Sequence, residues 1–285
     1  MLPLINLFSL LFIIFTINNH VHLRHAASAA SGGHIFIYSG CSQVKYQPNS
    51  PYETNLNSLL SSIVAASSQT LYNAFAIGND TAAPPDAAAY GLYQCRGDLK
   101  TTDCSTCIST LISQIELLCP YTNGASLQLD RCFVRYEDTD FLGKIDTSVR
   151  YKKCSPTRRG NDDVEFLRRR DGVLGDLQAA VGFRVSVTGA VEGYAQCLGD
   201  LSAADCSDCL GEAVAEVKSL CGSAAAGDVF LAQCYVRYWE AGYYDAASDS
   251  SNQDDVGKTV AIIVGVVAGV AVLIVLLSYC KKALG

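Results

Sequence analysis

The pattern of apolar and polar positions predicts the same order of elements twice along the chain. Alternating apolar and polar residues are typical of strands, and apolar residues at three- and four-residue steps are typical of helices. The first half gives a strand at 34–38, a helix at 54–75 capped by Thr54, a strand at 90–95, a helix from Thr102 or Asp103 to just before Pro120, and a strand at 126–136. The second half gives a helix at 162–181, strands at 183–188 and 194–198, a helix at 203–220 and a strand at 229–238.

Both halves carry one cysteine frame, displaced by 102 residues. Gln94–Leu99 reads Gln-Cys-Arg-Gly-Asp-Leu, and Gln196–Leu201 repeats it with one change. In each copy a Cys-x-x-Cys follows, then two more cysteines in the same register, then Val-Arg-Tyr. Five cysteines in identical register indicate a tandem duplication, in which each copy is one domain. We expect the domains to span 34–140 and 148–243.

The two ends of the chain have the character of targeting and membrane segments. Residues 1–30 combine an apolar run with a small-residue stretch, as in a cleaved signal peptide. An acidic stalk is expected at 244–258 and a transmembrane helix at 259–280, because an uncharged stretch of about 20 residues spans a bilayer core. Lys281 and Lys282 follow it, so the positive-inside rule predicts a type I protein with a cytoplasmic tail at 281–285.

Charge and composition narrow the range of functions. The net charge of −7 argues against nucleic acid as a partner. Thirteen cysteines indicate an oxidising compartment and a disulfide framework. All four histidines lie at or before His34, which disfavours a histidine base or a histidine metal site. We therefore predict no cofactor, no metal and no enzymatic activity.

The Cys-x-x-Cys pairs admit three interpretations: a zinc site, a redox pair and structural bridging. The fixed frame of six cysteines in each copy, which permits fifteen pairings, favours bridging.

Asn79 heads a predicted N-glycosylation sequon. In the predicted span, Gly265 and Gly269 form a small-xxx-small step suited to helix packing, and Cys280 beside two lysines suits palmitoylation.

The frame Cys-x8-Cys-x2-Cys, preceded by Gln-Cys-x-Gly-Asp-Leu and followed by Cys-Phe/Tyr-Val-Arg-Tyr, resembles the plant stress-antifungal domain, also called the ginkbilobin-homologous domain. Two copies with a signal peptide and one span resemble the plasmodesmata-located proteins. The resemblance implies an α+β fold with two helices on one antiparallel sheet in each disulfide-stapled domain. It also implies six pairs: Cys41–Cys119, Cys95–Cys104, Cys107–Cys132, Cys154–Cys221, Cys197–Cys206 and Cys209–Cys234.

The resemblance also locates a degenerate glycan site. Ginkbilobin binds mannose through an Asn, an Arg and a Glu, and the cysteine register places these positions at Ser42, Ser126 and Glu137. In the second copy they fall on Ser155, Asp228 and Trp239. Only Glu137 keeps the residue type, so we expect a solvated charge there in place of a mannose site.

The function implied by the resemblance is that of a non-enzymatic receptor-like protein of the plasma membrane at plasmodesmata. It would modulate cell-to-cell trafficking, with effects on callose, defence or viral movement. Its expected partners are the membrane, lateral membrane proteins or a second copy through the span, and a cell-wall glycan or a viral movement protein. The alternatives are a membrane-tethered glycan-binding lectin or antifungal protein and, less favoured, an apoplastic redox sensor.

Overall fold

The structure, a computed structural model, describes residues 34–81, 84, 86–156 and 163–243. The chain divides into two compact units, at 1–142 and 143–285, and each is described by itself. Within the described ranges no helix is both long and apolar enough to cross a bilayer. The predicted signal peptide, stalk, span and tail lie outside the described residues, together with Gly265, Gly269 and Cys280.

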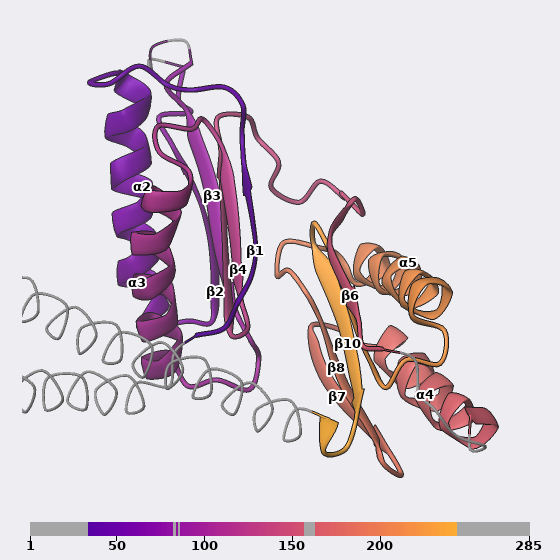
Figure 1. The fold of residues 1–285 in the computed structure, drawn as a ribbon. Coiled ribbons are helices and arrows are strands. Elements are labelled where there is room, and N and C mark those ends of the chain that lie inside the picture. The colour runs from indigo at the N-terminus through magenta and orange to yellow at the C-terminus, as the bar shows by residue number, and fades with distance from the viewer. Residues whose placement is uncertain (1–33, 82–83, 85, 157–162, 244–285) are drawn as a thin grey trace, which may run out of the picture. The chain divides into compact units, whose positions relative to one another are not determined.

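The first domain packs two helices on a five-stranded antiparallel sheet of order β1-β4-β5-β3-β2. Its elements are β1 (Phe36–Cys41), α2 (Pro51–Ser67), β2 (Tyr72–Ile77), β3 (Ala89–Cys95), α3 (Thr101–Leu118), β4 (Ala125–Leu129) and β5 (Cys132–Glu137). Figure 1 shows α2 and α3 side by side on one face of this sheet. The core between the layers is built from apolar side chains of both helices and from strand residues such as Leu127 and Val134.

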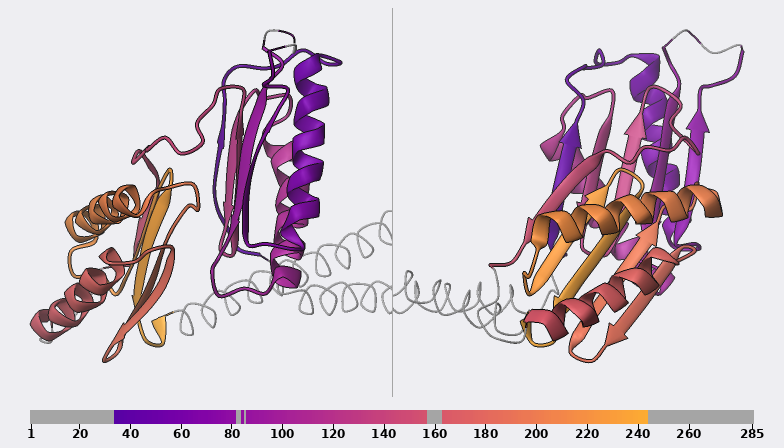
Figure 2. Two further views of the ribbon diagram at one scale, coloured as in Figure 1. Left: turned by 180° about the vertical axis from the view of Figure 1, so that it is seen from behind. Right: turned by 90° about the vertical axis from the view of Figure 1, so that its right-hand side faces the viewer.

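The second domain repeats this topology, with sheet order β6-β9-β10-β8-β7. Its elements are β6 (Val149–Cys154), α4 (Asp163–Gln178), β7 (Phe183–Thr188), β8 (Val191–Cys197), α5 (Ala203–Cys221), β9 (Ala226–Leu231) and β10 (Cys234–Glu240). Helices α4 and α5 again lie on one face of their sheet (Figure 2). The antiparallel α+β architecture in tandem agrees with the prediction from sequence.

The predicted helix at 54–75 is wrong at both ends. Helix α2 begins at Pro51, where the Ser50 hydroxyl caps it by accepting the Glu53 N–H at 3.2 Å. It ends at Ser67, and the later apolar residues, including Phe75, belong to strand β2. Phe75 fits a helical step from the earlier residues only by coincidence of spacing. The second helix starts at Thr101, before the predicted Thr102 or Asp103, and Lys100, which precedes it, makes no side-chain cap bond.

Two further predictions from sequence need correction. The single strands expected at 126–136 and 229–238 are each a hairpin of two strands, β4–β5 and β9–β10, joined by two residues. The core-facing positions are odd-numbered in the first arm, as Leu127 and Leu129, and even-numbered in the second, as Val134, so the alternation shifts by one residue at the turn. No strand is predicted from sequence between 139 and 161, but the structure has strand β6 there, and its pairing with β9 adds an edge to the second sheet.

Six disulfides staple the two domains, and they join the pairs that the resemblance implies. In each domain one bridge ties the end of the first strand to the end of the second helix region, as Cys41–Cys119 and Cys154–Cys221. The other two anchor the start of that helix to the central strands. The helices are therefore fixed to one face of each sheet, and the opposite face carries no helix of its own domain among the described residues.

Candidate functional site

The Val-Arg-Tyr motif places its arginine on the sheet face away from the helices. Side chains of a strand alternate between the two faces, so Arg237 points opposite to Val236 and Tyr238. Tyr238 belongs to the core under the helices, where its hydroxyl donates to the Ala224 carbonyl at 3.0 Å. Arg135 has the same position in the first domain. We call the face that carries the arginine the open face of each sheet.

On the open face of the second domain, Arg237 is held in a fixed orientation. Its Nε and Nη2 donate to the two carboxylate oxygens of Asp228 at 2.8 and 2.9 Å, and its Nη1 donates to the Tyr194 hydroxyl at 2.8 Å. The side chains of Arg237 and Asp228 are 11% and 10% exposed. A bidentate pair in such surroundings is geometrically specific, and each partner depends on the other for compensation of its charge.

Aromatic rings surround this ion pair. The arginine lies 5.6 Å from the ring centroid of Tyr194 and 5.8 Å from that of Phe230. Ring contacts of 4.9 to 6.0 Å then link six residues of the same face: Tyr151, Phe183, Tyr194, Phe230, Tyr235 and Trp239. The open face of the second domain is thus an aromatic platform with one neutralised arginine at its centre.

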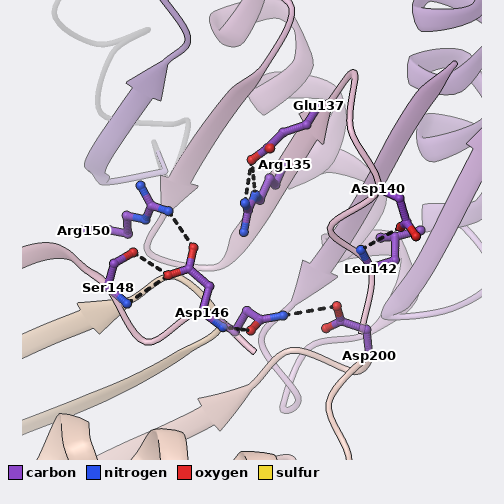
Figure 3. A network of polar contacts seen from close by, with 9 residues as sticks. Arg135, Glu137, Asp140, Leu142, Asp146, Ser148, Arg150 and Asp200 are labelled. Carbon is purple, nitrogen blue, oxygen red and sulfur yellow. Dashed lines mark hydrogen bonds and ion pairs between the residues drawn. The ribbon is translucent and has the colours of Figure 1, made fainter. Parts of the chain in front are cut away.

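In the first domain, the equivalent arginine has a different carboxylate partner. Asp228 is replaced by Ser126, and Arg135 donates instead to Glu137 on its own strand, with Nε 2.7 Å from Oε1 (Figure 3). The guanidinium carbon lies 4.2 Å from the centroid of the Phe141 ring, and Arg135 is buried. Each arginine is therefore matched by a carboxylate and an aromatic ring, although the partners come from different strands in the two copies.

The structure brings together only part of the degenerate glycan site. Ser126 pairs with Arg135 across β4 and β5, and Glu137 accepts from that arginine, so these two positions adjoin one another. Ser42 uses its hydroxyl locally, to accept the Val44 N–H at 3.1 Å. Glu137 is thus an ion-pair partner, which corrects the expectation of a merely solvated charge.

The second copy diverges further from a glycan site at these positions. The Ser155 hydroxyl accepts the Ala226 N–H at 2.9 Å and is buried, Asp228 is engaged by Arg237, and Trp239 packs on Tyr194. All three residues serve the domain's own structure. Arg135 and Arg237 lie in the Val-Arg-Tyr motif of the sequence analysis, which predicts no role for them. The feature that could have identified them is a charged residue that alternates with apolar residues in a buried strand.

A second polar cluster holds the segment that leads into the second domain. Asp200 Oδ2 accepts the Gly143 N–H at 2.9 Å. It also accepts a weaker bond from Gln233 Nε2 at 3.4 Å, and Gln233 Oε1 accepts the Asp146 N–H at 2.6 Å (Figure 3). In the first copy the equivalent Asp98 instead accepts from Arg96 at 2.7 and 3.1 Å. The second copy has Leu198 at the position of Arg96, and Asp200 accepts the backbone N–H of Gly143 instead.

Asp146 extends this cluster to the beginning of β6. Its carboxylate accepts from the Ser148 hydroxyl at 2.6 Å, the Ser148 N–H at 3.0 Å and the Arg150 guanidinium at 2.8 Å (Figure 3). Burial acts to raise the pKa of Asp146, but these bonds and the charge of Arg150 hold it below its ordinary value. The stabilisation is therefore present above the ordinary pKa and is lost as the pH falls through the lowered one.

Asp200→Ala is expected to release the segment that begins at Gly143. Amide hydrogen exchange of a peptide covering 143–148 should accelerate about 2- to 10-fold, because one hydrogen bond contributes about 0.5–1.5 kcal/mol net. Asp98→Ala removes the equivalent carboxylate of the first copy and is the matched control. Equal exchange in both variants would mean that Asp200 does not hold the segment.

The predicted glycosylation site is accessible. Asn79 lies in the loop between β2 and β3, and it is exposed, as are Asp80 and Thr81 of its sequon. This is compatible with the modification, which stays a prediction.

The Cys-x-x-Cys motifs do not form redox pairs in the structure. Cys104 and Cys107 bond to Cys95 and Cys132, outside the motif, and the second copy does the same. Among the described residues no group of three or more His, Cys, Asp or Glu side chains is arranged to hold a metal ion. The cysteines act as staples.

Comparison with known proteins gives a consistent set of relatives. The profile of the family described as salt stress response/antifungal matches residues 40–139 and 153–241. Plasmodesmata-located protein 8 of Arabidopsis thaliana is 57% identical over 253 residues, which cover 88% of this chain and 90% of the relative. Plasmodesmata-located protein 6 of the same plant is 45% identical over 258 residues, covering 87% and 88%.

A solved structure extends the likeness to three dimensions. The crystal structure of the tandem DUF26 ectodomain from the Arabidopsis thaliana cysteine-rich receptor-like protein PDLP8 is 57% identical in sequence and matches with a TM-score of 0.70. The match covers 74% of this chain and 100% of the solved chain.

Proposed function

The chain belongs to the salt stress response/antifungal family and is homologous to plasmodesmata-located proteins, and on this premise we propose that it is a non-enzymatic, receptor-like protein of plasmodesmata that modulates cell-to-cell trafficking. The observation that carries the proposal is the 57% identity to a plasmodesmata-located protein along nearly the whole of both chains. In this role the protein changes the permeability of the channel, through callose deposition and in response to defence or viral movement.

The disulfides support a location of both domains outside the cytoplasm. Twelve cysteines are paired, and such bridges form and persist in oxidising compartments. We therefore place the two domains outside the cell, with the stretch at 259–280 in the plasma membrane and 281–285 in the cytoplasm. A type I arrangement of this kind directs the output toward lateral partners, which include a second copy packed through Gly265 and Gly269.

The open faces support recognition over catalysis. The arginine of each face is matched by a carboxylate that already accepts its hydrogen bonds, as Arg237 by Asp228. Side chains that are paired in this way keep a fixed arrangement on the surface. They are poorly placed to exchange protons with a substrate.

A fluorescent fusion of the full chain tests the proposed location. We expect paired puncta across cell walls that overlap a callose stain. A uniform signal along the plasma membrane would contradict the proposal. A fusion that lacks 259–280 is the control and should lose the puncta, since it lacks the proposed anchor.

Glycan binding is the second candidate, because Ser126 and Glu137, two of the three positions that correspond to the mannose site of ginkbilobin, lie together beside Arg135. If this arrangement binds glycan, a glycan array should show binding that Glu137→Ala abolishes and that Glu212→Ala, on exposed α5 surface, preserves. We expect no such binding, because Glu137 is committed to Arg135 and the Ser42 hydroxyl to Val44.

A further inference from the structure

One end of the first domain exposes aromatic and apolar side chains that the fold does not require. Lys45 and Thr122 form an isolated antiparallel bridge, in which Tyr46 donates its N–H to the Tyr121 carbonyl at 2.9 Å and Asn123 donates to the Val44 carbonyl at 3.0 Å. The pairing places Tyr46 opposite Tyr121 and Val44 opposite Asn123, and the alternation of strands puts these four on one side. We call these four residues, together with Glu116, the tyrosine patch.

The two tyrosines form a corner of aromatic surface. Their ring centroids are 5.9 Å apart at an interplanar angle of 71°, and Tyr46 is further supported by Tyr52, at 5.5 Å. Tyr121 is 55% exposed and Val44 is 60% exposed. Tyr121 also has a φ of 61°, a left-handed conformation that residues with bulky side chains seldom adopt. Residues in such conformations are more frequent at functional sites.

Carboxylates surround this corner. Burial raises the pKa of Tyr46, and the charges of Glu53, Tyr121 and Glu116 raise it further. Glu53 is engaged by the Asn49 N–H at 2.5 Å, whereas Glu116 is exposed at the end of α3. The neighbouring cation Lys45 donates to the Pro120 carbonyl at 2.7 Å, and Asp138 accepts from Asn123 at 2.8 Å.

The second domain adopts the same fold with other residues at several of these positions. At the positions of Glu116, Leu117 and Tyr121, the second copy has Lys218, Ser219 and Ser223. The first domain is also the more acidic, since residues 34–142 contain ten Asp and Glu against five Lys and Arg. The patch is therefore an addition specific to the first domain, and its surroundings repel anions.

We propose that the tyrosine patch binds an organic cation, an aliphatic ammonium group placed against the ring of Tyr121 and within reach of the Glu116 carboxylate. Ammonium groups are attracted to the faces of aromatic rings, and a nearby carboxylate adds charge compensation. Val44 offers an apolar surface to the methylene chain of such a ligand. The ammonium group belongs either to a free polyamine or to a lysine side chain.

Isothermal titration of the full chain in non-ionic detergent with spermidine tests this site. We expect saturable binding that Tyr121→Ser and Glu116→Lys, the residues of the second copy, each weaken by about tenfold. Tyr121→Phe keeps the ring and should bind as the wild type does. Near-UV circular dichroism verifies that each variant is folded.

Glu212→Lys makes the same charge change on exposed α5 surface of the second domain and is the matched control. An equal loss in this variant, or an unchanged affinity in both Tyr121→Ser and Glu116→Lys, would overturn the site in favour of diffuse charge attraction. A parallel titration with Nα-acetyl-lysine amide separates the sources. Tighter binding of spermidine assigns the site to a polyamine, and tighter binding of the lysine derivative assigns it to a protein side chain.

Discussion

Removal of the Cys154–Cys221 disulfide, by Cys154→Ala with Cys221→Ala, is expected to lower the free energy of unfolding of the second domain by about 4 kcal/mol. The bridge joins residues 67 apart in sequence, and a loop of this size restricts the unfolded chain strongly. It also ties the end of edge strand β6 to the end of α5. Trp239 is the only tryptophan of the chain and lies in β10, so denaturant unfolding followed by its fluorescence reports this domain selectively.

The Cys197–Cys206 bridge of the same domain is the matched control. It closes only 9 residues, so the chain-entropy model gives a loss of about 2.5 kcal/mol for Cys197→Ala with Cys206→Ala. Cys197 and Cys206 are both buried, whereas only Cys221 of the long bridge is, so lost packing adds more to the cost of the control than to that of the long bridge. A control loss equal to or above that of the long bridge would contradict loop closure as the main source of the stabilisation.

The sequence predicted the fold best where the pattern repeats. The cysteine register revealed the duplication, and the three- and four-residue steps located all four helices that the structure describes. The prediction from sequence failed at the boundaries between neighbouring elements. Phe75 of β2 continued the helical step of α2, and the arms of β4–β5 read as one strand. The two adjacent polar residues Asp130 and Arg131 interrupt the alternation and mark the turn that was missed.

The site was less predictable, because it depends on pairing between strands. The alternation in Val236, Arg237 and Tyr238 already implies that the arginine faces away from its neighbours. That Asp228 lies opposite Arg237 follows only from the register of β9 against β10. Ser126 is the equivalent position in the first copy, so the difference in partner between the two copies became visible only once both registers were known.

Asp228→Ala is expected to destabilise the second domain by about 3–5 kcal/mol. The substitution removes the carboxylate that accepts two hydrogen bonds from Arg237 and compensates the guanidinium charge at a position that is 11% exposed. The bond to the neutral Tyr194 hydroxyl is kept but does not replace that charge. Urea unfolding followed by Trp239 fluorescence measures the change. Ser126→Ala, at the equivalent position of the first domain, is the control and should have a small effect, because Arg135 bonds to Glu137.

The double variant Asp228→Leu with Arg237→Met separates the value of the ion pair from the cost of breaking it. Apolar residues of similar size remove both charges together, so neither charge stays behind among Phe230, Tyr194 and Trp239. The double variant should then recover most of the stability lost in Asp228→Ala, since well-packed apolar replacements of a buried pair are often neutral. A loss as large as that of the single variant would mean that the hydrogen-bond geometry itself orders the aromatic platform. Near-complete recovery would mean that the pair is retained for the surface that it presents, which is the outcome expected from the recognition role proposed for this face.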